Sequence, residues 1–476
     1  MNRMPATSYD EIPYLSKPID ATHPDRLASV AALFGMNPAP VTACRVLEIG
    51  CGSGGNLLPM AYHLPGSRFT GIDLAGQAIV EGRRAAADLG IANLELIAMD
   101  LREMPDSFGE FDYIIAHGLF SWIPDELRDR LLDLCRDHLA LQGVAFISFN
   151  AMPGGHVRQM MRDMMLYHIR DEADPRQRIA RSQALLRKVS ESHLVSAAWQ
   201  PMIENEVRSS LNLDPGWLYH DEIAPINDPF PIRDFAARAA RHSLQYLGDA
   251  QPHLMFDSRV PLDWVGGDVI EREQYFDFLC FRSFRMTLLC RSEVALARPP
   301  GPEQMDRFYF ASSAREANGQ IQGLHSVCMK NPPEPVANVA RAMGAVYPQP
   351  LSFQELLAPA GDPDALRTIL FMLVTSGFAA LHTHRDRPPG PLRSHPRANR
   401  LARWESAVMG VVTWCDHQPR ALDSLTRALI DLMDGTRDFD SIAKHLARAE
   451  GAPPVDEVRA RLPEVLTALS HAGLLE

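Results

Sequence analysis

The segment Val46–Asn56, with the sequence VLEIGCGSGGN, constrains the fold of this chain more than any other. A run of β-forming residues leads into four closely spaced glycines, and an apolar stretch of helical character follows them. Glycine accepts positive φ angles and lets the backbone approach a ligand without a Cβ atom in the way. Such a loop between a strand and a helix predicts a parallel sheet that binds a ligand at the carboxyl ends of its strands.

The residues up to 150 continue this alternation of strands and helices. Strands are expected at Cys44–Ile49, Arg68–Ile72, Leu94–Met99, Asp112–Ala116 and Val144–Phe149. Helices are expected at Asn56–Leu64, Gln77–Leu89 and Asp125–Leu139. The predicted fold class is therefore α/β, with a Rossmann-like domain at the start of the chain.

The length of the chain predicts more than one domain. It has 476 residues, whereas a single hydrophobic core rarely grows beyond about 250 to 300 residues. After Pro153 the apolar spacing becomes helical, as in Val157–Arg170 and Arg176–Ser192, which indicates a mostly helical middle region. Two later blocks, 352–381 and 421–475, each hold two helical stretches and a short apolar ending, which is typical of winged-helix-like units.

The expected organisation is a ligand-binding domain with an N-terminal lid segment over 1–150, a helical middle domain over 151–300 and a winged-helix-like C-terminal domain over 301–476. Helices are also expected at Ile232–Leu247 and Arg272–Cys290. A homodimer is a further possibility, because the helical domain could present a self-complementary face.

Charge and cysteine content exclude several functional classes. The net charge of −12 and a pI near 5.8 make nucleic acids and anionic membranes poor partners. Residues 401–476 hold eight Lys or Arg against twelve Asp or Glu, so that block is expected to contact protein rather than DNA. The seven cysteines form no Cys-x-x-Cys pair, which indicates neither a disulfide framework nor a zinc site.

The location and the absence of a metal follow from similar arguments. The first residues contain no apolar signal segment, and the longest apolar run in the C-terminal half, Ile369–Leu381, is too short to span a bilayer. A cytoplasmic location without membrane insertion is therefore expected. His382 and His384 alternate as metal ligands do, but no further ligand stands at a recognisable spacing, so surface histidines and no metal site are expected.

Two acidic residues distinguish the possible ligands of the glycine loop. Gly50, Gly52 and Gly55 satisfy G-x-G-x-x-G, so the loop alone fits a nicotinamide dinucleotide as well as S-adenosylmethionine. Asp73 closes the second strand, where a carboxylate accepts the ribose hydroxyls of either ligand. Glu48 would face the cationic end of S-adenosylmethionine, whereas it would repel a pyrophosphate. The combination favours the methyl donor.

The adenine end of such a ligand would lie at the third strand. In Met99-Asp100-Leu101 the carboxylate of Asp100 can accept from the adenine amino group, while neighbouring backbone amides read the ring nitrogens. The expected donor-binding residues are Glu48, Gly50, Gly52, Gly54, Asn56, Asp73, Asp100, Leu101 and His117.

Candidate acceptor-side residues follow the fourth and fifth strands and the N-terminal segment. His117 and Asn150 end these strands and would point over the ligand. Tyr9 and Tyr14, on a segment that could fold as a lid, could supply hydroxyls and aromatic walls around an ammonium. His117, Tyr14 and Asn150 are the catalytic candidates. Structural roles remain open for His117 and Asn150 as hydrogen bonders, and for Tyr14 and Trp122 as packing residues.

These motifs carry a resemblance to known enzymes. Glu48–Asn56, Asp73 and Asp100 resemble motifs I, post-I and II of class I S-adenosylmethionine-dependent methyltransferases. A longer resemblance is to methyltransferases with a methyltransferase regulatory domain, the group that includes the rickettsial protein lysine methyltransferases of outer-membrane proteins. The residues that carry it are Tyr9-Asp10, Pro13-Tyr14, His23–Leu27, Asn56–Ala61, Ala116–Pro124, Ser148–Asn150, Pro153-Gly154, Glu273-Gln274, Asp277-Phe278 and Arg282–Arg285. This resemblance implies methyl transfer to lysine side chains of a protein.

Some acceptors are disfavoured, and three alternative functions remain open. His117–Phe120 lacks the Asn or Asp-Pro-Pro-aromatic turn of amide and adenine methyltransferases, and no Pro-Cys pair follows a strand as cytosine methylation requires. The alternatives are a small-molecule or biosynthetic methyltransferase, a non-catalytic regulator that keeps the donor fold, and a nicotinamide dehydrogenase.

Overall fold

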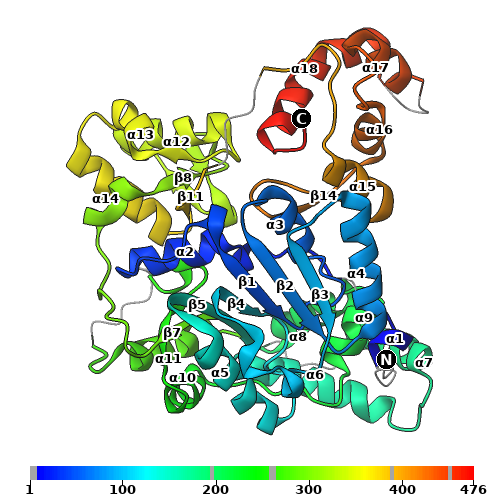
Figure 1. Cartoon of the computed structure of the whole chain (residues 1–476), viewed down its shortest axis with the longest axis vertical. Helices are drawn as coiled ribbons and strands as arrows, with labels where there is room; N and C mark the ends of the chain where they lie inside the picture. Colours follow the sequence, from blue (N-terminus) through cyan, green and yellow to red (C-terminus); the bar gives the residue numbers. More distant parts are fainter. Residues whose placement is uncertain (1–7, 15, 193–197, 257–263, 386–390, 449–452) are drawn as a thin grey trace.

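A seven-stranded mixed sheet with strand order β3-β2-β1-β4-β5-β7-β6 lies at the centre of the molecule (Figure 1). The computed structural model describes residues 8–14, 16–192, 198–256, 264–385, 391–448 and 453–476. The strands of this sheet are β1 (Arg45–Ile49), β2 (Arg68–Asp73), β3 (Leu94–Ala98), β4 (Phe111–Ala116), β5 (Leu139–Asn150), β6 (Leu244–Asp249) and β7 (Phe284–Arg291). The first five pair in parallel, whereas β7 runs antiparallel to β5 and β6. The predicted Rossmann-like α/β fold is confirmed.

Helices cover both faces of the sheet, and the strands fill a core on each face. The packed helices are α2 (Pro24–Leu33), α3 (Leu57–His63), α4 (Gly76–Leu89), α5 (Asp125–His138), α10 (Ile232–Arg241) and α11 (Val269–Cys280). Successive side chains of a strand point to opposite faces. On β1, Val46 therefore enters the core shared with α2, α3 and α4, and Leu47 enters the core shared with α5 and α10. Burial on both faces explains the continuous apolar runs of these strands.

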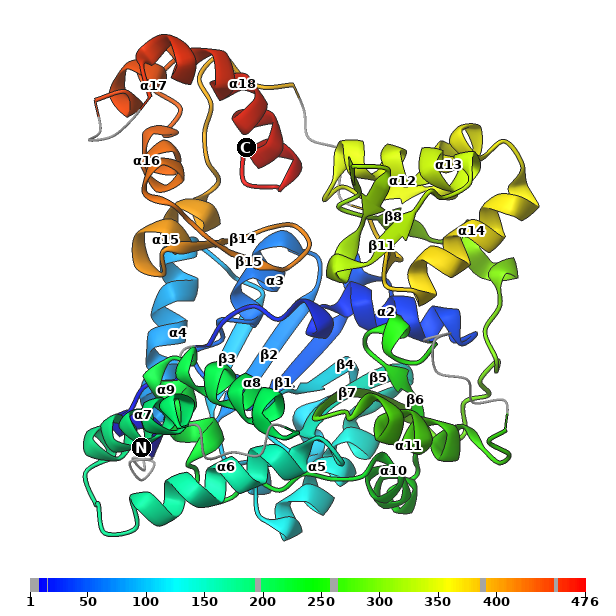
Figure 2. The same cartoon turned by 180° about the vertical axis from the view of Figure 1, so that it is seen from behind.

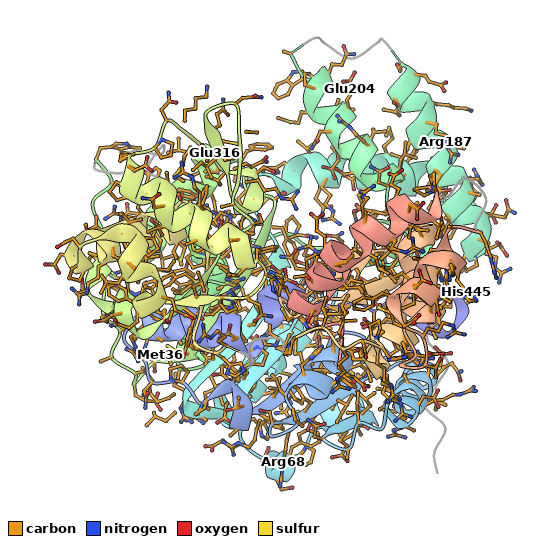
Figure 3. All side chains as sticks on the ribbon, turned by 90° about the horizontal axis from the view of Figure 1, so that it is seen from above. Met36, Arg68, Arg187, Glu204, Glu316 and His445 are labelled. Atoms are coloured by element: carbon orange, nitrogen blue, oxygen red, sulfur yellow. The ribbon has the colours of Figure 1, made fainter. Side chains whose placement is uncertain are left out.

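A helical region lies beyond the carboxyl ends of the parallel strands, between β5 and β6 in sequence (Figures 1 and 2). Its elements are α6 (Gly155–His168), α7 (Pro175–Glu191), α8 (Gln200–Leu211), α9 (Pro215–Trp217) and a π-helical turn over Leu218–Glu222. Figure 3 shows α7 and α8, labelled at Arg187 and Glu204, side by side at the rim of the molecule. This region overhangs the edge at which a ligand of the sheet would bind.

Two strands interrupt the region that was expected to be mostly helical. Residues 244–249 and 284–291 form β6 and β7, so the expected helices over Ile232–Leu247 and Arg272–Cys290 are too long. Ser243 and Phe281 stand between helix and strand with φ of 56° and 51°, a left-handed conformation that does not continue a right-handed helix. Short apolar runs fit a helix and a strand equally well by spacing alone. The domain boundaries near 150 and 300 stay predictions.

Two further units, each with its own core, complete the chain. The first contains β8 (Tyr309–Ala311), β9 (Arg315–Ala317), β10 (Gln320–Gln322), β11 (Cys328–Lys330), α12 (Glu334–Val346), β12 (Leu351–Ser352), α13 (Phe353–Ala360), α14 (Pro363–Thr375) and β13 (Ala380–His382). The second contains α15 (Arg400–Val408), β14 (Val411–Thr413), β15 (Pro419–Ala421), α16 (Ser424–Leu432), α17 (Phe439–Leu446) and α18 (Val455–His471). The two helices expected in 352–381 are α13 and α14, whereas 421–475 contains three helices, α16 to α18, in place of the expected two. Among the described residues, no helix is long and apolar enough to cross a lipid bilayer.

Buried ion pairs attach α11 to the sheet. Arg285 on β7 is 0% exposed and donates to Asp277 through Nε and Nη2, both at 2.8 Å, and from Nη2 to Glu273 at 2.8 Å. Arg282 forms a second pair with Asp277 at 2.8 Å. These carboxylates compensate the buried charge of Arg285, although its Nη1 has no hydrogen-bond partner among the described residues. The charged residues Glu273, Asp277, Arg282 and Arg285 of the sequence resemblance therefore serve the packing of α11.

Replacing Arg285 with methionine should lower the free energy of unfolding by about 3 to 5 kcal/mol, because the buried carboxylate of Glu273 would lose its cation and Asp277 would keep only Arg282. Urea denaturation measures the change. The matched control is Arg233→Met, which removes an exposed pair with Asp234 and should cost less than about 1 kcal/mol. Equal losses in the two variants would contradict the role given to Arg285.

Candidate active site

The glycine loop after β1 is built from left-handed backbone. Gly50, Gly52 and Gly54 have φ angles of 81°, 56° and 74°. The N–H groups of Gly50 and Cys51 donate to the carbonyl of Ile72 on β2, at 2.8 and 3.1 Å. Only glycine adopts such angles without strain, so the backbone at these positions depends on the residue type.

Gly55 makes room for the chain's own N-terminal segment. A Cβ atom at Gly55 would lie 2.3 Å from the carbonyl oxygen of Ser16. The N–H of Gly55 donates to Ser16 Oγ at 3.1 Å, and the N–H of Ile19 donates to Asn56 Oδ1 at 3.0 Å. Residues 16–19 therefore lie against the loop. This packing accounts for the last glycine of G-x-G-x-x-G without any pyrophosphate.

Glu48 is a buried carboxyl group at the tip of β1, 4% exposed. Its Oε1 accepts from Asn56 Nδ2 at 2.9 Å, and its Oε2 has no hydrogen-bond partner among the described residues. Burial raises the pKa of Glu48 to about 8, the Asn56 bond opposes this shift and the nearby Asp73 adds to it. A bound cation would stabilise the ionised form and supply the partner that Oε2 lacks.

Asp73, the last residue of β2, lies beside the glycine loop as predicted. Its Oδ2 accepts from the N–H of Gly52 and its Oδ1 from the N–H of Ala75, both at 2.7 Å. The carboxylate thereby connects the loop to the start of α4. A carboxylate offers about four acceptor sites, so one such group can contact both a backbone loop and a ligand.

Asp100 and Leu101 lie at the neighbouring strand end. The N–H of Met99 donates to the carbonyl of Asp73 at 2.9 Å, which brings the ends of β2 and β3 together. Asp100 caps the 3-10 turn Leu101–Glu103, and its carboxylate pairs with Arg102 at 2.5 Å. The Arg102 hydrogen bonds hold the pKa of Asp100 below its usual value. Because Arg102 is exposed, solvent weakens this pair, and a ligand can share the carboxylate.

His117 directly follows β4, and its side chain is half-buried. Its Nδ1 has no hydrogen-bond partner among the described residues, and the ring centroid lies 5.9 Å from that of Phe146 and 6.0 Å from that of Phe284. Burial lowers the pKa of His117 to about 4. A neutral imidazole of this kind can exchange a hydrogen bond with a ligand but carries no charge near neutral pH.

Asn150, at the end of β5, is a structural hydrogen bonder in this arrangement. Its Nδ2 donates to Asn227 Oδ1 at 2.6 Å, and its Oδ1 accepts from Arg158 Nη1 at 3.1 Å. Arg158 pairs in turn with Glu222 at 2.5 Å, and Asn227 Nδ2 donates to the carbonyl of Asp221 at 2.6 Å. Asn150 thus connects the sheet edge to the helical region.

The N-terminal segment brings Tyr9 and Tyr14 to the π-helical turn. The ring of Tyr9 stacks on His220 with centroids 4.0 Å apart, and Tyr14 Oη donates to Asp221 Oδ2 at 3.4 Å. The Tyr14 ring lies 6.2 Å from Trp217. Burial raises the pKa of Asp221 to about 7, although Arg158 opposes the shift. Figure 2 shows the segment, in dark blue, running from α1 (Ser8–Glu11) beside α9 up to α2.

Three residues that lie near Tyr9 and Tyr14 were not identified from the sequence: Arg158, Trp217 and Asp221. They belong to α6, α9 and the turn after it, and no motif connects them to the glycine loop. Trp122, for which a packing role was open, donates from Nε1 to the carbonyl of Asp221 at 3.2 Å and so supports this turn. The contacts join segments far apart in the chain, which spacing rules do not detect.

Three protein-family models match separate parts of the chain. A methyltransferase domain covers residues 46–143, which include the glycine loop, Asp73 and Asp100. A predicted methyltransferase regulatory domain covers residues 214–291, from α9 to β7. The C-terminal winged helix domain named for PKMT covers residues 394–452, from the start of α15 through α17.

Similar proteins extend the likeness over the whole chain. Uncharacterized protein RP789 of Rickettsia prowazekii is 29% identical over 479 residues, 93% of this chain and 86% of its own length. Uncharacterized protein RP028 of the same organism is 31% identical over 241 residues, 50% of this chain and 96% of its own length. The structure of PKMT2 from Rickettsia typhi in complex with AdoHcy has 23% identity, covers 97% of this chain and 100% of that one, and has a TM-score of 0.83.

The sheet, the glycine loop and the methyltransferase-domain match define an S-adenosylmethionine-dependent methyltransferase. Within that class, the chain belongs to the family that adds a methyltransferase regulatory domain and a PKMT C-terminal winged helix domain to the catalytic fold.

Replacing Glu48 with glutamine should stabilise the ligand-free protein at alkaline pH. The folded pKa of about 8 lies above the ordinary 4.5, so the wild type loses stability as pH rises from about 4.5 to 8. Glutamine still accepts from Asn56 and does not ionise. The variant should match the wild type near pH 4 and exceed its free energy of unfolding by roughly 3 to 5 kcal/mol above pH 8.

Denaturant titrations at both pH values measure this difference, with Glu81→Gln on the exposed face of α4 as the control. The same gain at both pH values would contradict the assignment of a buried, proton-binding Glu48.

Proposed function

We propose that this methyltransferase transfers methyl groups to lysine side chains of a protein substrate. The single observation that carries the proposal is the position of Lys17. Lys17 belongs to the N-terminal segment that lies against the glycine loop, and its Nζ lies 3.8 Å from the centre of the Trp217 ring. This contact of the chain's own ammonium with an aromatic ring supports the binding of a lysine head group beside Trp217.

The donor-side residues in this proposal are those at the ends of β1, β2 and β3. Glu48 Oε2 would accept from the amino group of the donor, Asp73 from its ribose hydroxyls, and Asp100 and Leu101 would contact adenine. The glycine loop provides backbone contact at Gly50, Gly52 and Gly54, and Asn56 orients Glu48. The unpartnered buried Oε2 and the left-handed glycine backbone of the loop fit such a ligand. When bound, S-adenosylmethionine supplies a methyl carbon made electrophilic by its sulfonium.

The acceptor-side residues would hold and desolvate the lysine. Tyr14, Trp217 and Asp221 lie close together and would supply a hydroxyl, an aromatic face and a carboxyl group. Burial lowers the pKa of Lys17 at this wall, and the same desolvation would favour the neutral amine that attacks the methyl carbon. His117 would border the ligand from β4. Asn150 would act indirectly, through Arg158 and Asn227.

Relatives support a protein acceptor. The family model that covers residues 394–452 is named for PKMT, and the structure with the same fold is PKMT2 of Rickettsia typhi. A small-molecule or biosynthetic acceptor is the alternative, since it would need the same donor residues. We further propose a cytoplasmic location, where S-adenosylmethionine is made, and no nucleic-acid substrate, because the net charge is −12.

The deciding experiment incubates the enzyme and tritiated-methyl S-adenosylmethionine with a bacterial lysate and then separates protein from small molecules. Label in protein that hydrolyses to methyl-lysine is the expected result. Label confined to small molecules would refute the lysine acceptor and favour a biosynthetic role. The Asp73→Ala variant, which lacks the carboxylate beside the glycine loop, measures the background labelling.

The same assay tests the acceptor wall. Tyr14→Phe should slow protein labelling about tenfold, because one hydrogen bond to Asp221 is lost, while affinity for S-adenosylhomocysteine changes less than about twofold. Tyr167→Phe, at an exposed position of α6, is the matched control. A large loss of ligand affinity in Tyr14→Phe would place this hydroxyl on the donor side instead.

We also propose a homodimer through the outer face of α11. Phe278 and Leu279 are 53% and 55% exposed there, next to the exposed rings of Tyr275 and Phe281. A contiguous apolar patch of this kind is characteristic of a contact surface.

Light scattering should report twice the monomer mass for the wild type and the monomer mass for the double variant Phe278→Asp, Leu279→Asp. The control is Val408→Asp, which changes an isolated exposed residue on α15 and should stay dimeric. A monomeric wild type would contradict the dimer.

A further inference from the structure

The tip of the β14–β15 hairpin, in the C-terminal unit, reaches the back of the glycine loop. His417 at this tip is 4% exposed, and its Nε2 bonds to Asn56 Oδ1 at 3.0 Å across 361 positions of sequence. The next residue, Gln418, donates to Asp20 Oδ2 at 3.3 Å. The hairpin therefore contacts both the N-terminal segment and the residue that holds Glu48.

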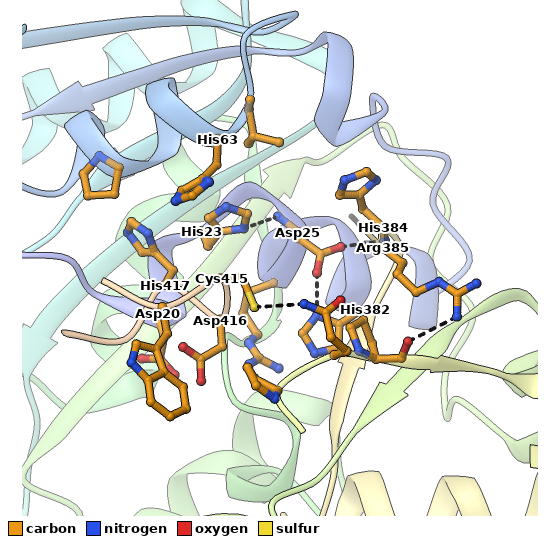
Figure 4. Close-up of a pocket in the computed structure, with 17 residues that line it drawn as sticks. Asp20, His23, Asp25, His63, His382, His384, Arg385, Cys415, Asp416 and His417 are labelled. Carbon is orange, nitrogen blue, oxygen red and sulfur yellow. Dashed lines mark hydrogen bonds and ion pairs between the residues drawn. The ribbon is translucent and has the colours of Figure 1, made fainter. Parts of the chain in front are cut away.

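His417 lies in the wall of a cleft between the sheet domain and the two C-terminal units (Figure 4). The cleft encloses about 740 Å³, including space open to solvent. Its other residues include His382 and His384, which were expected to be ordinary surface histidines. Both are half-buried, and His382 Nδ1 bonds to the buried Asp25 at 2.7 Å. Their position follows from contacts between β13 and α2 that no local pattern reveals.

The hydrogen bonds around Asn56 define which way its amide points. The N–H of Ile19 can only donate, so the atom it contacts must be the amide oxygen. His417 therefore donates to the same oxygen and carries its hydrogen on Nε2. The opposite end, Nδ2, donates to Glu48 Oε1 and to Thr22 Oγ1, both at 2.9 Å.

Asn56 donates a hydrogen bond to Glu48 Oε1, whereas Glu48 Oε2 has no hydrogen-bond partner among the described residues. The orientation of Oε2 thus depends on the plane of the Asn56 amide. On its oxygen side the amide accepts from donors at opposite ends of the chain, the Ile19 N–H and His417 Nε2, and Thr22 Oγ1 also contacts the oxygen at 3.2 Å. His417 supplies the contact from the C-terminal unit, and its loss would allow the amide to shift on its remaining Ile19 and Thr22 contacts and Glu48 to turn with it.

We propose that His417 is a positioning residue for the methyl donor: it orients Asn56, and Asn56 orients Glu48 toward the amino-acid end of the ligand. The C-terminal winged helix domain then forms part of the donor site, in addition to any contact with the acceptor. This inference rests on the proposed role of Glu48.

The test compares two ligands that share adenosine but differ at the end that Glu48 would contact. S-adenosylhomocysteine has the amino-acid group and 5′-methylthioadenosine lacks it. By calorimetry with the full-length protein, His417→Leu should weaken S-adenosylhomocysteine about tenfold and 5′-methylthioadenosine less than about twofold, as expected for one lost buried hydrogen bond. His417→Gln, which restores an N–H donor, should recover most of the affinity.

Two controls separate this effect from general damage. His384→Leu alters the opposite wall of the cleft and should change neither affinity. In a Glu48→Gln background, adding His417→Leu should cause almost no further loss, because residues that act through one another are not additive.

Equal weakening of both ligands, or no change in either, would overturn the role of His417. If Glu48→Gln itself leaves the preference for S-adenosylhomocysteine intact, the donor-site assignment fails instead. If Glu48→Gln removes the preference and His417→Leu does not, only the inference about His417 fails.

Discussion

A carboxyl group buried with one oxygen unpartnered is the constraint on which the donor site depends. Burying Glu48 at the tip of β1 opposes its ionisation and raises its pKa to about 8. The chain contains 47 Lys and Arg residues, yet none in the described part of the structure forms an ion pair with Glu48. A cationic ligand would stabilise the ionised form of this buried carboxyl group. The group therefore favours ligand binding while it lowers the stability of the ligand-free protein.

The segments that enclose Glu48 come from both ends of the chain. Ser16 lies against the glycine loop, Ile19 and Thr22 hold Asn56 from the N-terminal side, and His417 holds it from the C-terminal side. A hydrogen-bond network of buried polar groups is stable only when all its members are present. The site is therefore completed by the folding of the whole chain, and the methyltransferase domain alone lacks several of these contacts.

The sequence was sufficient to predict the features that depend on local structure. The five parallel strands, their helices and the positions of Glu48, Asp73 and Asp100 follow from hydrophobic periodicity and from the turns at strand ends. The strands β6 and β7 were not predicted because their apolar runs fit a helix or a strand, and the choice is made by the pairing of β7 with β5 and of β6 with β7. The contacts of Tyr14 with Asp221 and of His417 with Asn56 join distant segments, so no spacing predicts them.

This difference between local and distant contacts also explains why the donor is easier to identify than the acceptor. The donor residues stand at the ends of successive strands, where the sheet determines their relative positions. The proposed acceptor wall, in contrast, is formed by α6, α9 and the π-helical turn, which are inserted between β5 and β6. Side chains in an inserted region can be substituted without a change in the positions of the strand ends. Asn150 is a strand-end residue that does contact the inserted region, through its hydrogen bonds to Arg158 and Asn227. Asn227 in turn donates to the carbonyl of Asp221, so these bonds hold Asp221 at the edge where the donor would bind.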